Sequence, residues 1–356
     1  MKARIEQVRA RFAEEGIEAL VVTGAANRRY LSGFTGSAGM LLITPAEALL
    51  LTDFRYVEQA TMQAPDFQVV RYDDPYKTLS ERLQAFAGRR VGFEAEHVTV
   101  AQMEKLREAA SVEWVPTRML VEKVRAIKDA SELALIQAAV DLADRCFEHI
   151  LPQLKPGVTE REIAWRMEKF MRENGADGLA FQTIVASGPN GALPHARPTD
   201  RPLAAGEFVT LDFGCVWKGY CSDITRTVFL GEPTAKHREL YELVLRAQEA
   251  GVAAVRPGRS GREVDAVARD IIAQAGYGDA FGHGLGHGLG LEVHEEIPRL
   301  STRSETVLAP GMVTSVEPGV YLPGWGGIRI EDLVVVTEDG CQILTKSPKE
   351  LVCLPV

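Results

Sequence analysis

Five side chains of the types that bind hard metal ions lie in strand-like or glycine-rich stretches of the second half of the chain. In chain order they are Asp212, Asp223, His287, Glu317 and Glu331. Buried charges without partners are costly or are neutralised by protons. A pair of divalent cations would balance four carboxylates, so this pattern requires a fold in which separate strand ends converge on one point.

The first two of these residues lie in a predicted hairpin. The segment 206–230 contains two alternating, β-branched runs around a short turn, which is typical of an antiparallel pair. If the turn is centred between Trp217 and Lys218, Asp212 and Asp223 are direct cross-strand partners with Cβ atoms about 4.5–5.5 Å apart. That separation suits paired metal ions, which lie roughly 3.5–4 Å apart. The alternative is that either aspartate caps a turn or faces solvent.

The two glutamates lie at the ends of apolar strands. Glu317 follows a buried run and precedes Pro318-Gly319, which forces a turn. Arg329 and Glu331 are two residues apart and therefore share one face of a predicted strand, whereas Asp332 lies on the other face. A charged residue at a strand end is commonly a rim residue, but two such acids are better explained as metal ligands.

A glycine-rich stretch at 281–295 holds three of the seven histidines of the chain, His283, His287 and His294, among five glycines. So many glycines exclude a stable helix and let the backbone approach a ligand closely. A flexible surface loop is the alternative, although the stretch has almost no solubilising residue. A fourth histidine, His195, precedes the Asp212 strand and by itself is typical of an ordinary loop.

These ligand types indicate both the metal and the reaction class. Oxygen-rich ligation with one imidazole favours Mn²⁺, with Fe²⁺, Co²⁺ or Zn²⁺ as alternatives. Two such ions lower the pKa of a bound water and stabilise a developing oxyanion, so we predict hydrolysis of a carbonyl compound. The five cysteines show no CxxC spacing, which indicates neither structural zinc nor a disulfide framework.

Net charge and hydropathy limit the classes of partner that we expect for this chain. A net charge of −9 argues against nucleic acid, whose binders present a basic stripe. No stretch approaches the roughly 20 apolar residues that span a bilayer, so no membrane partner is predicted, and the amphipathic start lacks the pattern of a signal peptide. We therefore expect a reduced, cytoplasmic enzyme that acts on a peptide or another small molecule.

The 356 residues are enough for roughly two domains. Residues 1–122 alternate helices and strands, which predicts an α/β domain with a mixed sheet. A charged linker is expected at 123–128. Residues 129–356 repeat a helix pair followed by a β-rich block, which predicts an α+β domain with two related halves around a curved antiparallel sheet.

Four segments carry a resemblance to a known family, namely LDFGCVWKGYCSDITRT, GHGLGHGLGLEVHE, VEPGVY and GIRIEDLVVV. Their order and spacing resemble the Asp, Asp, His, Glu, Glu metal set of the pita-bread metallopeptidases, specifically the Xaa-Pro peptidases aminopeptidase P and prolidase. FTGSAGMLLIT and LLLTDFRYVEQA resemble the creatinase-type N-terminal domain of aminopeptidase P relatives. The resemblance therefore spans essentially the whole chain.

The resemblance implies a dinuclear centre held by all five residues. It implies that Glu317 moves a proton while water attacks the carbonyl before proline, and that His294 stabilises the tetrahedral intermediate. His195 would contact the substrate backbone, His283 would help to shape the proline pocket, and Arg329 would orient the metal-binding carboxylates.

Peptides with proline at the second position are the implied substrates, and a homodimer is the implied assembly. The FTGSAG and TDFRY similarity favours aminopeptidase P over prolidase. Asp53, Arg55 and Tyr56 are expected either to reach a neighbouring subunit's active site or to form a strand-end salt bridge. A catalytically silent protein-binding module and a metal-free creatinase-type amidinohydrolase are alternatives that should lack the full ligand set, and methionine aminopeptidase would not need the first 122 residues.

Overall fold

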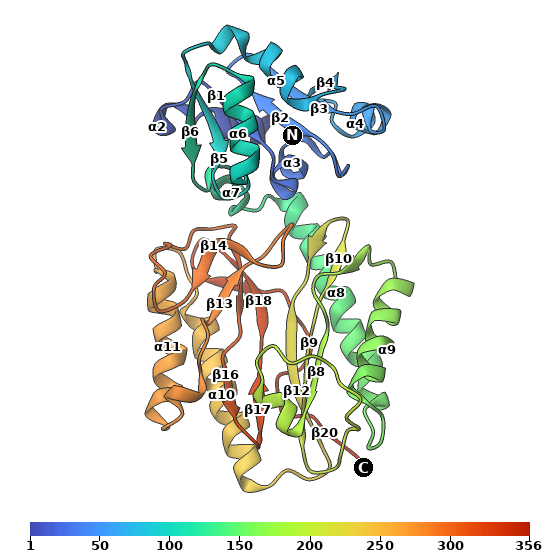
Figure 1. The fold of residues 1–356 in the computed structure, drawn as a ribbon. Helices are drawn as coiled ribbons and strands as arrows, with labels where there is room; N and C mark the ends of the chain where they lie inside the picture. Colours follow the sequence, from blue (N-terminus) through green and yellow to red (C-terminus); the bar gives the residue numbers. More distant parts are fainter. The chain divides into compact units, whose positions relative to one another are not determined.

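The computed structural model describes residues 1–356, and the chain divides into two compact units, Met1–Arg125 and Ala126–Val356 (Figure 1). None of its helices combines the length and the apolar character needed to cross a bilayer. All five cysteines are free thiols.

The first unit is built on a six-stranded mixed sheet in the order β4-β3-β2-β1-β5-β6. Its strands are β1 (Ala19–Val22), β2 (Met40–Ile43), β3 (Ala48–Thr52), β4 (Gln68–Arg71), β5 (Arg90–Glu94) and β6 (Glu113–Thr117). Only the β1–β2 and β2–β3 pairs are antiparallel. The apolar strand β1 is buried along its whole length, and β2 and β3 are buried except at their first residue, which confirms the predicted α/β architecture.

Seven helices complete this unit. They are α1 (Lys2–Arg9), α2 (Phe12–Glu15), α3 (Ala25–Ser32), α4 (Val57–Gln63), α5 (Pro75–Leu83), α6 (Val100–Ala109) and α7 (Leu120–Arg125). The start of α6 shows how local sequence sets these bounds, because Thr99 accepts the backbone N–H of Gln102 while the Gln102 side chain returns to Thr99.

The second unit contains two helix pairs, each followed by strands. The helices are α8 (Ala130–Ile150), α9 (Glu160–Glu173), α10 (Ala235–Ala254) and α11 (Gly261–Gln274). Figure 1 shows α8 and α9 on one side of the strands and α10 and α11 on the other. This repeat confirms the predicted pair of related halves.

Two larger sheets and two small ones form the β-rich blocks, in the orders β20-β12-β9-β8, β14-β13-β15-β18-β19, β11-β10-β7 and β16-β17. In the first half the strands are β7 (Gly178–Leu179), β8 (Ile184–Ser187), β9 (Phe208–Phe213), β10 (Cys215–Trp217), β11 (Tyr220–Cys221) and β12 (Ile224–Leu230). In the second half they are β13 (Gly286–Gly288), β14 (Glu295–Leu300), β15 (Val313–Val316), β16 (Gly319–Leu322), β17 (Gly326–Arg329), β18 (Asp332–Val336), β19 (Cys341–Ile343) and β20 (Cys353–Leu354).

The halves meet where β12 runs beside the β17–β18 segment. The Glu331 backbone N–H donates to Thr225 O at 3.1 Å, and Thr227 Oγ1 donates to Arg329 O at 2.9 Å. Buried helix and strand residues form two main apolar cores, and Phe208 and Phe229 of the first half pack into the core of the second. A fully buried large side chain contributes about 1.5–3 kcal/mol. The boundary between the two halves, called the seam below, therefore consists of strands that are joined by hydrogen bonds and packed against apolar cores.

Candidate metal centre

The five predicted ligands line one cavity of about 530 Å³ in the second unit. Asp212 lies near the end of β9, Asp223 just before β12, and His287 within β13. Glu317 and Glu331 lie in the short connections that follow β15 and β17. Strand ends from both halves thus bring four carboxylates and one imidazole to the same place.

The hairpin that carries the two aspartates differs from the prediction by one residue. Trp217 pairs with Tyr220, so the central turn residues are Lys218 and Gly219. Both have positive φ, at 48° and 90°. A two-residue turn of this kind matches the twist of the flanking strands, and it requires a residue such as glycine that tolerates positive φ.

This shift changes the cross-strand partner of Asp212, so the predicted direct pairing with Asp223 is wrong. Thr225 is the residue opposite Asp212. Asp223 instead lies in a break of the ladder, where the backbone at Gly214 passes so close to Ser222 that an added Cβ would lie 1.9 Å from Ser222 O. Both aspartates nevertheless face the cavity.

His287 presents one ring nitrogen to the carboxylates. Its Nδ1 lies 3.1 Å from Gly288 O, and because a carbonyl can only accept, Nδ1 carries the proton. Nε2 is therefore the nitrogen that faces the carboxylates, 3.3 Å from Glu317 Oε1 and 3.6 Å from Asp223 Oδ2. It can donate to Glu317 when the ring is protonated and can bind a metal ion when it is not. The ligand atoms of Asp223, His287 and Glu331 all lie within 4.8 Å of one another, close enough to share one cation.

The electrostatics of the carboxylates show how crowded this site is. Burial, followed by the charges of Glu331 and Asp212, raises the pKa of Asp223 well above its usual range. Burial and the charges of Glu317 and Asp212 do the same to the pKa of Glu331. Like charges at this separation cannot all ionise without a compensating positive charge.

The pKa of Glu317 shifts in the opposite direction from those of Asp223 and Glu331. Burial acts to raise its pKa, but the hydrogen bond and the charge of His287 together lower that pKa to about 2. Burial likewise acts to lower the pKa of His287, and Glu317 reverses this and raises it. Glu317 is therefore the carboxylate of the set whose charged form the metal-free site favours.

An unpartnered oxygen shows that the donor set suits a cation. Glu331 Oε2 accepts from Thr225 Oγ1 at 2.8 Å, whereas Glu331 Oε1 is buried and has no hydrogen-bond partner. A buried polar atom left without a partner costs about 1–3 kcal/mol. Oxygen-rich donors with one imidazole are the set that divalent transition ions prefer, so these residues fit a metal site.

Arg329 lies behind the carboxylates and is itself buried. Its Nη2 donates to Asp212 Oδ2 at 2.5 Å, and its Nε donates to Thr225 Oγ1 at 3.1 Å. Because Thr225 in turn donates to Glu331, one guanidinium fixes carboxylates from both halves. Asp332 points away from the cavity and pairs with the buried Arg226 at 2.8 Å, as expected for the opposite face, although the structure interrupts the predicted strand at 330–331.

His283 lines the cavity. Its ring is hydrogen-bonded to Tyr321, a residue that no sequence pattern marked. Arg329 Nη1 donates to Tyr321 Oη at 2.8 Å, so the Tyr321 proton goes to His283 Nε2, also at 2.8 Å. His283 Nδ1 is 2.8 Å from Gly284 O. Burial raises the pKa of Tyr321 to about 12, so the phenol stays a donor and both ring nitrogens of His283 are occupied.

His195 and His294 also line the cavity and are exposed to it. The His294 ring packs edge-on against His287 with centroids 4.2 Å apart. Burial and the charge of His287 lower the pKa of His294, which favours its neutral form. Two cationic side chains that no sequence pattern marked, Arg197 and Arg299, also line the cavity.

In the first unit, Asp53 and Arg55 form a bidentate pair after β3, with N···O distances of 2.9 and 2.7 Å. Tyr56 Oη lies 2.8 Å from Ser37 Oγ. These contacts match the strand-end salt bridge that was one of the two expectations for this segment.

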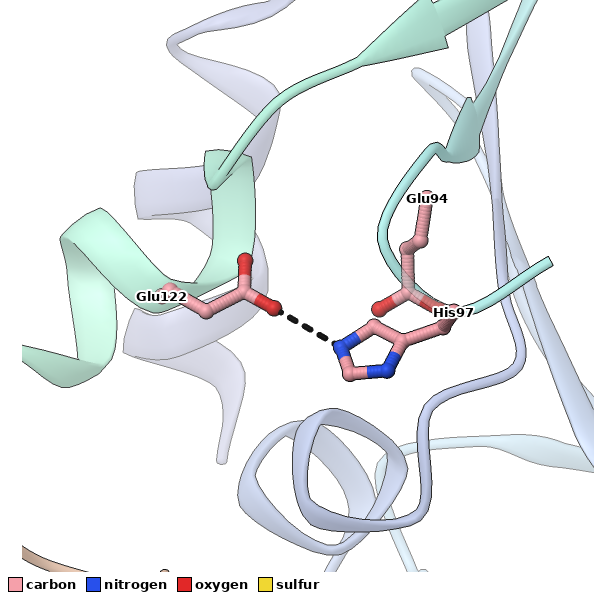
Figure 2. Close-up of side chains that lie close together, drawn as sticks. All are labelled: Glu94, His97 and Glu122. Atoms are coloured by element: carbon pink, nitrogen blue, oxygen red, sulfur yellow. Dashed lines mark hydrogen bonds and ion pairs between the residues drawn. The ribbon is translucent and has the colours of Figure 1, made fainter. Parts of the chain in front are cut away.

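A second cluster of metal-ligand types lies in the first unit, and Figure 2 shows His97 directed at Glu122 beside Glu94. His97 Nε2 is 3.0 Å from Glu122 Oε1. The Asn27 amide nitrogen donates to Glu94 at 2.7 Å and to Glu122 at 2.6 Å, while Glu94 Oε2 also accepts two backbone N–H groups at the start of α3. An amide donor therefore lies where a cation would bind, and we interpret this cluster as a hydrogen-bonded network.

The comparisons with known families cover both units. Residues 134–338 match the model of metallopeptidase family M24. Residues 4–127 match the creatinase/prolidase N-terminal domain.

Individual relatives match along the full length. The Xaa-Pro dipeptidase of Pyrococcus furiosus is 37% identical, over 99% of this chain and 100% of that protein. A solved Xaa-Pro dipeptidase from Bacillus anthracis is 47% identical with a TM-score of 0.96, covering 99% of both chains. An X-Pro aminopeptidase from Thermotoga maritima is 39% identical with a TM-score of 0.89, covering 95% of this chain and 98% of that one.

Proposed function

Since the chain belongs to metallopeptidase family M24, we propose that it hydrolyses the bond before proline in Xaa-Pro dipeptides. The observation that carries the proposal is the convergence of all five ligand residues on one cavity, with an unpartnered oxygen of Glu331 among them. The sequence favoured aminopeptidase P; full-length relatives named as dipeptidases support prolidase better.

In this proposal Asp212, Asp223, His287, Glu317 and Glu331 hold two divalent cations, with Mn²⁺ as the proposed ion. When bound, the cations lower the pKa of a water molecule and balance the charge of the oxyanion. Glu317 accepts a proton from that water as its oxygen bonds to the carbonyl carbon. Its charged form, which the metal-free site already favours, is the form that can accept a proton.

The same proton completes the reaction. The amide before proline has no N–H, so its nitrogen must gain a proton when the C–N bond breaks. Glu317 delivers the proton it took from water, and the products are an amino acid and free proline. Neutral His294, beside His287 at the cavity wall, is the proposed donor to the carbonyl oxygen as negative charge develops there.

Three further residues shape the substrate site. His195 contacts the substrate backbone from the loop that leads to β9. His283 cannot donate to substrate through Nε2, because that nitrogen accepts from Tyr321; its ring is instead a wall for the pyrrolidine. Arg329 keeps the metal-binding carboxylates in place.

The free carboxylate of a dipeptide needs a cation, and Arg299 is positioned to supply it. It lines the cavity, its side chain is 52% exposed, and its only ion pair is with Glu296 at the surface. A longer peptide has no charge at this point. An aminopeptidase is the second candidate, favoured by the similarity to the Thermotoga maritima structure.

Rates on three substrates test the function. Protein stripped with chelator and reloaded with Mn²⁺ should cleave Ala-Pro, should cleave Ala-Pro-Ala much more slowly, and should leave Ala-Ala intact. Faster cleavage of Ala-Pro-Ala would identify an aminopeptidase. Activity that survives complete metal removal would overturn the metal-dependent mechanism, and no activity on any proline peptide would favour a silent binding module. A cytoplasmic location and a homodimer stay predictions from the sequence.

A further inference from the structure

A buried glutamate that the proposed chemistry does not use, Glu160, begins α9. Its relative exposure is 0%. The carboxylate accepts five hydrogen bonds from one loop: Ser187 N at 2.7 Å and Ser187 Oγ at 2.8 Å reach Oε1, while Asn190 Nδ2 at 2.9 Å, Thr199 N at 3.0 Å and Thr199 Oγ1 at 2.7 Å reach Oε2. One side chain therefore ties together both ends of the segment 187–199, the His195 loop.

Glu160 is carried by a helix that is firmly packed in the core. Helix α9 buries Ile163 and Met167 completely in the core of the first half, and Thr159 caps its first turn by accepting Glu162 N at 3.2 Å. A charged carboxylate without partners would be unstable at such a depth. The five donors resolve that problem only when the loop is in place, so burial of Glu160 and order in the loop depend on each other.

The middle of the His195 loop contacts the strand that carries Arg329, next to the proposed metal ligands. Arg329 Nη1 donates to Pro194 O at 3.2 Å, next to His195. Gly191 and Gly327 of β17 pack backbone to backbone, since a Cβ at Gly327 would lie 1.9 Å from Gly191 O. The loop is thus held between Glu160 at its ends and the strand that carries Arg329 at its middle.

We propose that Glu160 is a positioning residue that holds the His195 loop as a preformed wall of the substrate cavity. The role assigned to His195 rests on the proposed function; the holding of the loop does not. A loop that is ordered before substrate arrives spares the binding step the cost of ordering it. Misplacing a contact residue by an ångström can lower rates about 100-fold, so an untethered loop should depress kcat/KM by about 10- to 100-fold.

Glu160→Gln tests the proposal, because the new NH₂ group would face N–H and O–H donors whichever way the amide turns. Hydrogen exchange of the Mn²⁺-loaded protein should show faster exchange at the Ser187 and Thr199 amides, with α10 and α11 unchanged. Glu162→Gln, the same change two residues later on the exposed face of α9, is the matched control and should alter neither exchange nor activity. Unchanged exchange in the His195 loop, or loss of protection throughout the unit, would overturn the inference.

A double-mutant cycle tests whether Glu160 acts through His195. Glu160→Gln should lower kcat/KM for Ala-Pro about 10- to 100-fold in the wild-type background, but less than about twofold when His195 is already alanine. Equal losses in both backgrounds would overturn the link. Thr199→Val, which removes one donor and keeps the N–H, should give a smaller effect of the same sign and serves if Glu160→Gln does not fold. If exchange changes as expected but no variant cleaves Xaa-Pro peptides, the proposed function fails while the loop anchor stands.

Discussion

The guanidinium of Arg329 donates to Asp212 at 2.5 Å, with 4% and 14% of the two side chains exposed. Burial acts to lower the pKa of Arg329, and the surrounding Tyr321 and carboxylates hold it well above the usual value. This permanent positive charge orients Asp212 without neutralising the other carboxylates, which leaves them able to bind cations.

Arg329→Lys should therefore damage catalysis more than metal content. A lysine keeps the charge but cannot reach Asp212, Tyr321 and Thr225 at once, because it lacks the planar fork. Loss of such an orienting group typically costs 10- to 100-fold, and we expect kcat for Ala-Pro to fall by about that factor. Kinetics with metal analysis on the same sample check this, and wild-type kcat in the variant would contradict the role.

Glu331→Gln should have opposite effects on stability with and without metal. In the chelated protein the change removes one of several crowded carboxylates, so the melting temperature should rise, by about 2–4 °C for each kcal/mol of repulsion relieved. In Mn²⁺ the variant should hold fewer ions, lose activity and melt below the wild type. Differential scanning calorimetry with metal analysis measures both. Glu338→Gln, a change of an exposed carboxylate outside the cavity lining, is the control.

Metal binding should weaken as the pH falls. The pKa values of Asp223 and Glu331 are raised in the folded, metal-free protein by burial and by neighbouring carboxylates. Protons therefore compete with the ions, and binding should release them. Calorimetric titration with Mn²⁺ in two buffers of different ionisation enthalpy measures the protons released, and identical heats in the two buffers would contradict the expectation.

The same shifts predict a pH dependence of stability for the chelated protein. A carboxyl whose folded pKa exceeds its unfolded value of about 4 stabilises the fold at low pH and loses that contribution as the pH rises to the folded pKa. The melting temperature should thus fall between mildly acidic and mildly alkaline pH when metal is absent. Mn²⁺ should remove most of this slope.

Arg299→Met should separate dipeptides from longer peptides. A hydrogen bond to a charged group contributes about 1.5–3 kcal/mol, so KM for Ala-Pro should rise roughly 10- to 100-fold. KM for the uncharged Ala-Pro amide should change little. Arg303→Met, which changes an exposed arginine outside the cavity lining, is the matched control. Equal effects on both substrates would mean that Arg299 does not bind the carboxylate.

Short-range patterns in the sequence predicted more of the proposed metal ligands than of the residues around them. The glycine-rich stretch around His287 and the turn after Glu317 are short-range signals, and the structure places both residues at the cavity. The partner of Asp212 depended on the centre of a turn, and a shift of one residue exchanged Asp223 for Thr225. Pattern alone could not decide that Lys218 adopts positive φ.

Other features depend on contacts between distant segments. Tyr321 is an ordinary strand residue until Arg329 and His283 are brought to its hydroxyl. In the sequence, nothing distinguishes Arg299 and Glu160 from the many other charged residues. Their roles follow from what surrounds them, which the order of residues along the chain does not reveal.

The origin of the five ligands has a consequence for how the second unit stays assembled. Asp212 and Asp223 belong to the first helix–sheet half, whereas His287, Glu317 and Glu331 belong to the second. Ions bound between them, as we propose, would link the two halves, and their binding energy would be added to the docking of one half on the other. Metal starvation would then expose the enzyme to local opening and degradation as well as inactivity, and its abundance would follow metal supply.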